Sequence, residues 1–299
     1  MLVRFEGSIW DIVRWQWRRI TLYALVAACV VLIHDVEHQA WFEIPSWPLA
    51  VVGSAIGIFV SFRSQAAYGR WWEGRILWGR LVNVSRVFAS QLQSYVDADA
   101  AVRNRFLHRH ICYVHMLRQA LRYQDPLADP EALCCMDEAL RSHVSRAPNP
   151  TYAVLDRQLS ELVALSNAGQ LDAFRLRSFD TSLTEMLAVQ GGCERIRNTP
   201  LPRIYAFVTR QLVNTYGVLL PLALVDSLYW ATVPANVLVC MSFMLIEEIG
   251  RELEEPFSMS APALPLHAIC RTIERDMRFQ LGDATLPRAD APDARGVLM

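Results

Sequence analysis

Four long stretches of this 299-residue chain contain no Asp, Glu, Lys or Arg. They are residues 20–34, 44–62, 211–225 and 227–246, with 15, 19, 15 and 20 residues. A helix needs roughly 20 mostly apolar residues to cross a bilayer, with about 17 as the lower limit. Two stretches reach that length outright, and two reach it with a polar residue at one end. The stretches are therefore either membrane spans or buried core helices, and the placement of charge decides between them.

Arginine lies on one side of these stretches. Residues 35–43 contain three acidic residues and no arginine, and the junction between the last two stretches offers only Asp226. All arginines lie before the first stretch, between the second and third, or after the fourth. Positive charge marks the cytoplasmic side of a membrane protein. The pattern predicts four spans, with both termini and the long middle segment in the cytoplasm.

The composition excludes several other classes of protein. Hydrophobic residues make up 53% of the chain and charged residues 20%, which excludes disorder and coiled coil. A net charge of −1 gives no basic field for nucleic acid, so no nucleic-acid partner is expected. The seven cysteines form no CxxC motif, which favours reduced thiols over a disulfide framework, and adjacent Cys134 and Cys135 are interpreted as ordinary thiols.

The segment between the second and third stretches predicts helices, because its apolar residues recur at steps of three and four. These positions are Leu81, Val84, Phe88, Leu92 and Val96, followed by Phe106, His110, Val114, Leu117 and Leu121. Breaks are expected at Asp125-Pro126 and at residues 147–150, with helices around 151–166 and 172–197. The predicted fold class is all-α, with four transmembrane helices and a large cytoplasmic helical region.

This reading divides the chain into five regions. Residues 1–62 are the N-terminal region with the first two spans, at about 20–36 and 44–66. The other predicted regions are a cytoplasmic helical region at 63–203, the third and fourth spans at 204–257, a cytoplasmic segment at 258–282 and a tail at 283–299. The tail is rich in Pro, Ala and Asp, so disorder is expected there.

No enzyme signature is present in the sequence. There is no HExxH, no GxSxG and no glycine-rich phosphate loop, so we expect no catalytic residue and no cofactor. His34 and His38 lie one helical turn apart beside acidic residues. Zinc usually needs three or four protein ligands, so a polar span end is the better interpretation and no metal site is predicted.

The second stretch combines small and apolar residues in two patterns. Gly53 and Gly57 form a GxxxG motif, which is typical of close helix packing. Ser54, Ile58 and Phe62 fall on one stripe at i, i+4 and i+8. If several copies of the chain surround an axis, this stripe lines a pore with narrow apolar rings, which can gate ions by dewetting.

Three blocks of sequence resemble the bestrophin family in its bacterial branch. They are FRSQAAYGRWWEGRILWG at residues 62–79, CERIRNTPLP at 193–202 and EEIGRELEEPF at 247–257. The resemblance covers nearly all of the chain except the last ~15 residues, which are the tail set aside on composition. It implies a homopentameric ion channel with one central pore, as a multi-pass protein of the bacterial inner (plasma) membrane.

The resemblance also implies which residues constrict the pore. The family's neck, formed by apolar residues of the second span, falls on Ser54, Ile58 and Phe62, where Ser54 departs from the apolar pattern. A second, cytoplasmic constriction falls around residues 176–178. Leu176 there would give an apolar ring, whereas Arg177 would give a cationic ring that favours anions.

Calcium opens the animal members, through an acidic run after the third block. Here Phe257 is followed by Ser258-Met259-Ser260-Ala261-Pro262, with no carboxylate before Glu274. Calcium prefers six to eight oxygen ligands, usually including carboxylates, so we expect this calcium site to be absent.

Three functions remain open on the sequence. The first is a channel for small monovalent ions, with chloride as the family default. The second is a cation (sodium)-selective channel of the same architecture, because Asp35, Glu37 and Glu43 would concentrate cations at the outer mouth. The third is a non-conducting membrane scaffold whose cytoplasmic helices bind a partner.

Overall fold

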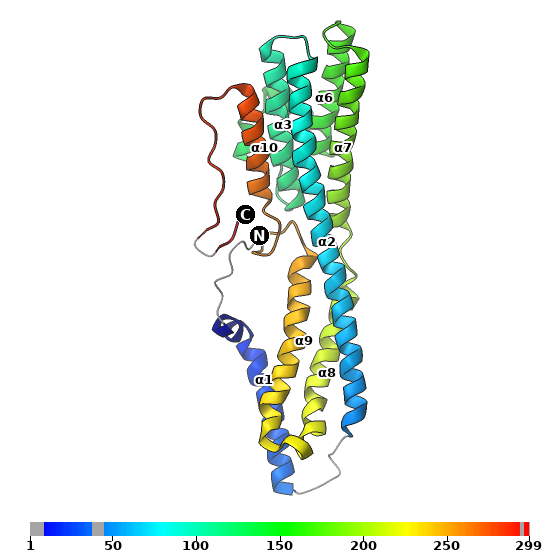
Figure 1. The fold of residues 1–299 in the computed structure, drawn as a ribbon, viewed down its shortest axis with the longest axis vertical. Helices are drawn as coiled ribbons and strands as arrows, with labels where there is room; N and C mark the ends of the chain where they lie inside the picture. Colours follow the sequence, from blue (N-terminus) through cyan, green and yellow to red (C-terminus); the bar gives the residue numbers. More distant parts are fainter. Residues whose placement is uncertain (1–8, 38–44, 294–295, 299) are drawn as a thin grey trace. The chain divides into compact units, whose positions relative to one another are not determined.

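A computed structural model describes residues 9–37, 45–293 and 296–298 of the chain. These residues form helices and connecting loops and contain no β-strand, so the predicted all-α class is confirmed (Figure 1). The helices are α1 (Ile9–Glu37), α2 (Ser46–Tyr95), α3 (Ala100–Leu121), α4 (Pro130–Leu133), α5 (Glu138–Val144), α6 (Pro150–Asn167), α7 (Ala173–Asn198), α8 (Arg203–Leu228), the 3₁₀ turn η2 (Tyr229–Ala231), α9 (Thr232–Glu254) and α10 (Leu266–Leu281).

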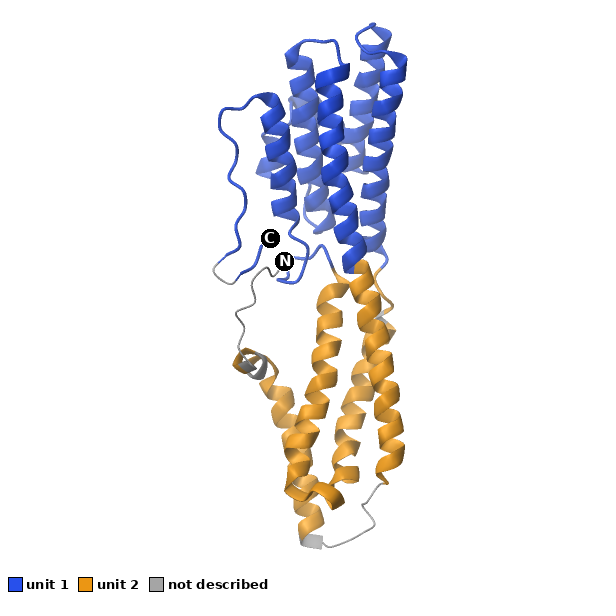
Figure 2. Ribbon diagram, viewed as in Figure 1, with its two compact units in different colours: residues 1–4, 71–199, 256–299 blue, residues 5–70, 200–255 orange. Residues whose placement is uncertain are grey.

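The chain divides into two compact units, drawn in two colours in Figure 2. The span unit comprises residues 5–70 and 200–255, and the bundle unit comprises residues 1–4, 71–199 and 256–299. Helix α2 contributes to both units. Residues 63–70 belong to the span unit, because α2 continues unbroken there and Arg63 finds a partner within that unit. The start of the cytoplasmic region at residue 63 stays a prediction.

Helices α1, α8 and α9 pack against one another in the span unit. Helices α8 and α9 lie side by side, and the chain reverses between them at Tyr229, whose φ is +47° (Figure 1). Three helical stretches are long and apolar enough to cross a membrane, namely Arg14–Asp35, Ser46–Tyr95 and Ile204–Glu254. The third contains both α8 and α9, so the four predicted spans lie one each on α1, α2, α8 and α9. The number of actual membrane crossings stays a prediction.

Polar side chains hold the interior of the span unit together. The Tyr23 hydroxyl donates a hydrogen bond to Asn214 Oδ1 at 2.9 Å. Asn236 is fully buried, and its Nδ2 donates to the carbonyl oxygens of Tyr23 and Gly217 at 3.2 Å each. In a bilayer, hydrogen bonds of this kind connect helices that apolar burial alone would not hold together.

The bundle unit has a conventional apolar core. It is formed by the C-terminal half of α2 together with α3, α6, α7 and α10. All ten positions of the predicted 3–4 periodicity are buried, from Leu81 to Val96 and from Phe106 to Leu121. Helices α6 and α7 match the two helices expected around 151–166 and 172–197. Their caps explain the boundaries, because the Asn149 and Asp172 side chains accept hydrogen bonds from the first turns.

The segment after α10 contacts that helix at several places. The Asp283 carboxylate pairs with Arg278, and the carbonyl oxygen of Pro287 accepts a hydrogen bond from Arg275 at 3.2 Å. Asp290 lies 3.3 Å from His267 Nδ1. Residues 283–293 contain no helix. The disorder that composition predicts for this tail concerns its behaviour in solution and stays a prediction.

Candidate functional site

The stripe predicted on the second span lies on an outward face of α2. Ile58 is 59% exposed and Phe62 71% exposed. Ser54 is also exposed, and its hydroxyl donates a hydrogen bond to the carbonyl oxygen of Ala50 at 2.9 Å. This internal bond satisfies the Ser54 hydroxyl donor within the helix itself. The three side chains therefore form one continuous surface that the span unit leaves uncovered.

The other face of the same helix is the packing face. Gly53 lies against Tyr216 of α8, where an added Cβ would come 2.5 Å from the phenol oxygen. Ile56 and Val60 are buried among α8 and α9 side chains. The GxxxG motif therefore serves helix packing, as its spacing indicates. Packing of this face turns the stripe outward, so the two patterns in the sequence have separate roles.

A buried ion pair lies one residue beyond the stripe. Arg63 is 6% exposed, and its Nη1 donates to Glu247 Oε1 of α9 at 2.9 Å. Its Nη2 donates to Glu254 Oε2 at 3.4 Å. A buried pair of this kind is costly to break, because the remaining buried charge loses its shortest ion-pair contact. The sequence analysis did not single out this pair. The available signal was that Arg63 and Glu247 are the first charges after two apolar stretches.

The two charged residues Arg70 and Glu73 of the first block do not pair with each other. Spacing allows an i, i+3 ion pair between Arg70 and Glu73. Instead, Arg70 Nε donates to the carbonyl oxygen of Glu254 at 3.1 Å, and Glu73 pairs with Arg195 of α7. Trp78 is fully buried in the bundle core, and Trp71 Nε1 donates to the carbonyl oxygen of Pro262 at 3.1 Å. These residues therefore serve structure.

The predicted cytoplasmic constriction lies in the first turns of α7. Leu176 is partly buried and packs on the bundle core, whereas Arg177 is exposed. The Arg177 carbonyl oxygen accepts a hydrogen bond from Thr181 Oγ1 at 3.0 Å. Of the two, Arg177 is the side chain that is free of the protomer core. Their role in a constriction stays a prediction.

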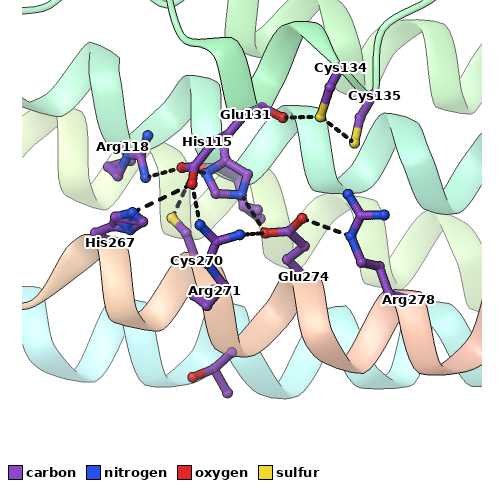
Figure 3. Close-up of polar contacts among 12 residues, drawn as sticks. His115, Arg118, Glu131, Cys134, Cys135, His267, Cys270, Arg271, Glu274 and Arg278 are labelled. Carbon is purple, nitrogen blue, oxygen red and sulfur yellow. Dashed lines mark hydrogen bonds and ion pairs between the residues drawn. The ribbon is translucent and has the colours of Figure 1, made fainter. Parts of the chain in front are cut away.

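A buried charge cluster joins α3, α4 and α10 in the bundle unit (Figure 3). At its centre His115 is fully buried, with Nδ1 3.2 Å from Glu131 Oε2 and Nε2 3.4 Å from Glu274 Oε2. Arg118 Nη1 donates to Glu131 at 2.8 Å, and Arg271 pairs with both carboxylates. We call these five residues the charge cluster.

The pKa values in the cluster follow from burial and ion pairing. Burial disfavours the charged imidazole of His115, but hydrogen bonds to Glu131 and Glu274 outweigh burial and raise its pKa. The His115 contact holds the pKa of Glu131 well below its usual range. Burial acts against ionisation of Glu274, yet its contacts with His115 and Arg278 lower its pKa to about 2. The carboxylates are therefore ionised and the imidazole favours its charged form.

Two members of the charge cluster and the neighbouring Asp129 form the one group of described residues with metal-ligand spacing. His115, Asp129 and Glu131 bring ligand atoms within 4.8 Å of one another. However, Arg118 pairs with both Asp129 and Glu131, so the carboxylates are already neutralised by a cation that is always charged. The donor set therefore fits an ion-pair network better than a divalent metal.

The profile described as bacterial/fungal bestrophin protein matches residues 1–279. The voltage-dependent anion channel-forming protein mll4386 of Mesorhizobium japonicum is 34% identical over 82% of this chain and 79% of its own length. The voltage-dependent anion channel-forming protein YneE of Escherichia coli K12 is 34% identical over 82% of this chain and 80% of its own length.

Solved structures agree with the sequence comparisons. The crystal structure of a bacterial bestrophin homologue from Klebsiella pneumoniae superposes with a TM-score of 0.84 at 30% identity, covering 89% of this chain and 98% of that chain. The family profile, the sequence relatives and the fold point the same way, and the resemblance seen in the three sequence blocks is confirmed. This chain belongs to the bacterial and fungal branch of the bestrophin family.

Proposed function

We propose that this chain forms a homopentameric channel for small monovalent ions, with anions such as chloride as its permeant ions. Five copies surround one axis, and each contributes Ser54, Ile58 and Phe62 of α2 to an apolar neck. The pore lies in the cell inner membrane, with both termini in the cytoplasm. Membership of the bestrophin family and the anion-channel names of the relatives support this function.

The outward stripe on α2 is the observation that carries the proposal. Ile58 and Phe62 are large apolar side chains that the protomer leaves mostly exposed, although the same helix buries its opposite face. One protomer cannot enclose a water-filled path with a single helix. A closed ring of copies can, because a cyclic assembly brings the same stripe to the axis from every subunit. Narrow apolar rings then control ion passage by wetting and dewetting.

The sign of the permeant ion is the finer part of the proposal. Apolar rings impose little charge selectivity, so charged rings elsewhere on the path decide the sign. Arg177 is exposed and would form a cationic ring that favours anions. Asp35 at the end of α1 is also exposed and would favour cations. A sodium-selective channel of the same architecture is therefore the second candidate.

We also propose that the segment after α9 holds no calcium ion that opens the channel. Residues 258–262 offer hydroxyl and backbone oxygens, and the Ser258 and Ser260 hydroxyls lie 2.9 Å apart. Hydroxyls without carboxylates make a poor calcium site. Currents measured with calcium and with a calcium chelator on the cytoplasmic side are expected to be the same.

The reversal potential of the purified protein in planar bilayers under a KCl or NaCl gradient tests the function. A potential near the chloride equilibrium value supports the anion channel, and one near the cation value supports the second candidate. Ile58→Ala and Phe62→Ala are expected to change the single-channel conductance several-fold. Leu25→Ala in α1 and Leu238→Ala in α9 are matched controls, since they are 59% and 68% exposed but lie off the stripe.

Three results would contradict the proposal. If the stripe variants and the control variants change the conductance equally, the neck is not formed by the stripe on α2. Absence of current from a protein shown to be a folded pentamer in detergent would favour a membrane scaffold that binds a cytoplasmic partner. A chain that is monomeric in detergent while it carries current in bilayers would overturn the pentamer itself.

A further inference from the structure

Two adjacent thiols lie at the end of α4, next to the charge cluster. Cys134 is exposed and Cys135 is 8% exposed, and their sulfur atoms are 3.5 Å apart (Figure 3). The Cys134 thiol donates to the carbonyl oxygen of Glu131 at 3.2 Å, which fixes its direction. The two side chains therefore converge on one point, as the two arms of a chelating dithiol do.

Both thiols line a pocket between α3 and the start of α5. The pocket has a volume of about 380 Å³, and its other walls include His108, Arg105 and Arg109 of α3. Arg109 is 3% exposed and ion-paired with Glu161, yet its Nε has no hydrogen-bond partner. The pocket thus offers room beside the sulfur atoms, and Arg109 in its wall has buried nitrogen donors without a hydrogen-bond partner.

A disulfide between these two cysteines is disfavoured by the backbone. Adjacent Cα atoms across a trans peptide are about 3.8 Å apart, whereas disulfides usually join Cα atoms about 4.4–6.8 Å apart. The local turn is also fixed, because the amides of Cys134 and Cys135 donate to the carbonyl oxygens of Pro130 and Ala132 at 3.0 and 3.2 Å. Chelation of a third atom needs no such distortion.

The sulfur separation limits which atom can be chelated. With bonds of about 2.3 Å to thiolate sulfur, a 3.5 Å separation corresponds to an angle of about 100° at the bound atom. This angle excludes a linear two-coordinate ion. Zinc is also disfavoured, because no His, Asp or Glu in the described part of the chain completes a three-ligand group with the two sulfurs. A pyramidal centre that needs only two protein thiols fits both limits.

We propose that Cys134 and Cys135 form a binding site for trivalent arsenic, either as arsenite or as an organic arsenical with one carbon substituent. With an organic arsine oxide, two S–H bonds and the As=O bond break, two As–S bonds and two O–H bonds form, and one water leaves. With arsenous acid, two As–OH bonds break instead and two waters leave, so that one hydroxyl stays on arsenic. Arsenic stays trivalent, so no oxidant or reductant is needed. The remaining substituent on arsenic occupies the pocket near Arg109.

The reaction suits thiols in their protonated form. Burial raises the pKa of the Cys135 thiol above its usual range, with the neighbouring Cys134 adding to the effect. Condensation consumes the thiol protons in the water that leaves, so a preformed thiolate is not required. The site depends on the geometry of the pair and is independent of ion conduction.

Phenylarsine oxide is the probe that tests the site on the full chain purified in detergent under reducing conditions. Intact-mass analysis is expected to show one phenylarsenic adduct per chain, with loss of two titratable thiols. The adduct should survive a monothiol and be removed by 2,3-dimercaptopropanol, because only a dithiol competes for both bonds. Cys134→Ser and Cys135→Ser should each abolish the adduct.

Cys29→Ser is the matched control, since Cys29 is an exposed cysteine in α1 with no neighbouring cysteine in the sequence. It should leave the adduct unchanged. Size-exclusion profiles and helical circular dichroism check that each variant is folded, and Cys134 is the safer position because it is exposed. An adduct that persists in Cys134→Ser, or no adduct with the folded unmodified chain, would overturn the proposal.

Discussion

The span unit and the bundle unit place apolar and polar side chains in opposite ways. In the span unit, Leu25 and Leu238 are 59% and 68% exposed, while Asn236 is fully buried. In the bundle unit, Phe88 and Leu117 are fully buried, and exposed ion pairs such as Arg86–Asp276 lie at its surface. Each unit thus matches a different solvent. Burial of apolar surface stabilises the bundle in water, whereas polar contacts and close packing hold helices together in lipid.

The bundle unit also buries charge, at Arg109 with its partner Glu161 and in the charge cluster. His115 and Glu274 are buried there, but each faces a partner of opposite charge. The two units therefore differ in how they stabilise a buried polar group. The span unit joins neutral groups by hydrogen bonds and buries charge in the Arg63 ion pairs and at Glu248, which pairs with Arg251. The bundle unit uses several ion pairs to join α10 to α3 and α4.

The largest expected difference between the units is the effect of removing an aromatic ring. Phe88→Ala in the bundle should lower the free energy of unfolding by about 3–5 kcal/mol, because it leaves a cavity beside Phe179, whose ring centroid is 5.7 Å away. Phe207→Ala in the span unit, where the ring is 64% exposed, should cost less than about 1 kcal/mol. Denaturant unfolding in detergent measures both losses. Equal losses of unfolding free energy would show that the two units do not differ in how they use apolar side chains.

The next effect concerns the buried ion pair of the span unit. Glu247→Gln should cost about 3 kcal/mol, since Arg63 stays buried with only the longer contact to Glu254. Arg86→Ala is the control in the bundle unit. Its partner Asp276 is exposed, so less than about 1 kcal/mol is expected. The double variant Arg63→Met, Glu247→Leu removes both charges, so it distinguishes loss of the ion pair from the cost of one buried charge left behind. In thermal unfolding, the double variant should be more stable than Glu247→Gln.

A smaller effect is expected for the neutral polar contact inside the span unit. Asn236→Ala removes two hydrogen bonds to backbone carbonyl oxygens of α1 and α8 and should cost about 1–2 kcal/mol. Unfolding in detergent measures the loss. Ser242→Ala is the control, because the Ser242 hydroxyl is exposed and bonds only within α9. A loss at Ser242 as large as that at Asn236 would mean that interhelical hydrogen bonds do not hold this unit.

The smallest effect expected is a pH dependence that only the bundle unit shows. The pKa of His115 is raised in the folded chain, so its contribution is complete below its ordinary pKa of 6.5 and is lost as the pH rises through the raised value. The groups facing His115 are Glu131 and Arg118 from α4 and α3, and Glu274 from α10. Hydrogen exchange of α10 should therefore speed up at alkaline pH.

His115→Gln is the control for the pH prediction. This variant should flatten the alkaline change in α10 exchange without altering the exchange of α8 or α9. Glu274 has its pKa lowered to about 2, so it contributes stability above its ordinary pKa and loses it as the pH falls toward that value. Alkaline loosening of α10 that persists in His115→Gln would assign the effect to other groups.

Much of the fold could be predicted because helices leave a periodic record in the sequence. The 3–4 spacing of Leu81 to Leu121 identified buried positions, and the Pro and Asn residues around 147–150 marked the start of α6. The stripe on α2 could be read for the same reason. A side chain three or four residues away lies on the same face, whatever the rest of the chain does.

The partners of the charges could not be predicted in this way. Arg63 and Glu247 are 184 positions apart, and only tertiary packing brings them together. Arg70 and Glu73 have a spacing that allows pairing, yet the contacts of each lie with α9 or α7. Adjacent Cys134 and Cys135 likewise showed nothing unusual in the sequence, because convergence of their sulfur atoms depends on how the short turn after α4 is held.

Helix α4 has only four residues, Pro130–Leu133, and this shortness has a consequence for the order of folding. A helix of one turn is not stable alone, because the conformational entropy lost in forming the first turn exceeds the free energy gained from its few hydrogen bonds. Its conformation therefore depends on the Asp129 cap and on the ion pairs of Glu131, one partner of which lies on α10. We expect α4 to form only after α3 and α10 have met. The two thiols that follow it would then acquire their spacing among the last events of folding, and their joint reactivity would be a chemical marker of a fully assembled bundle.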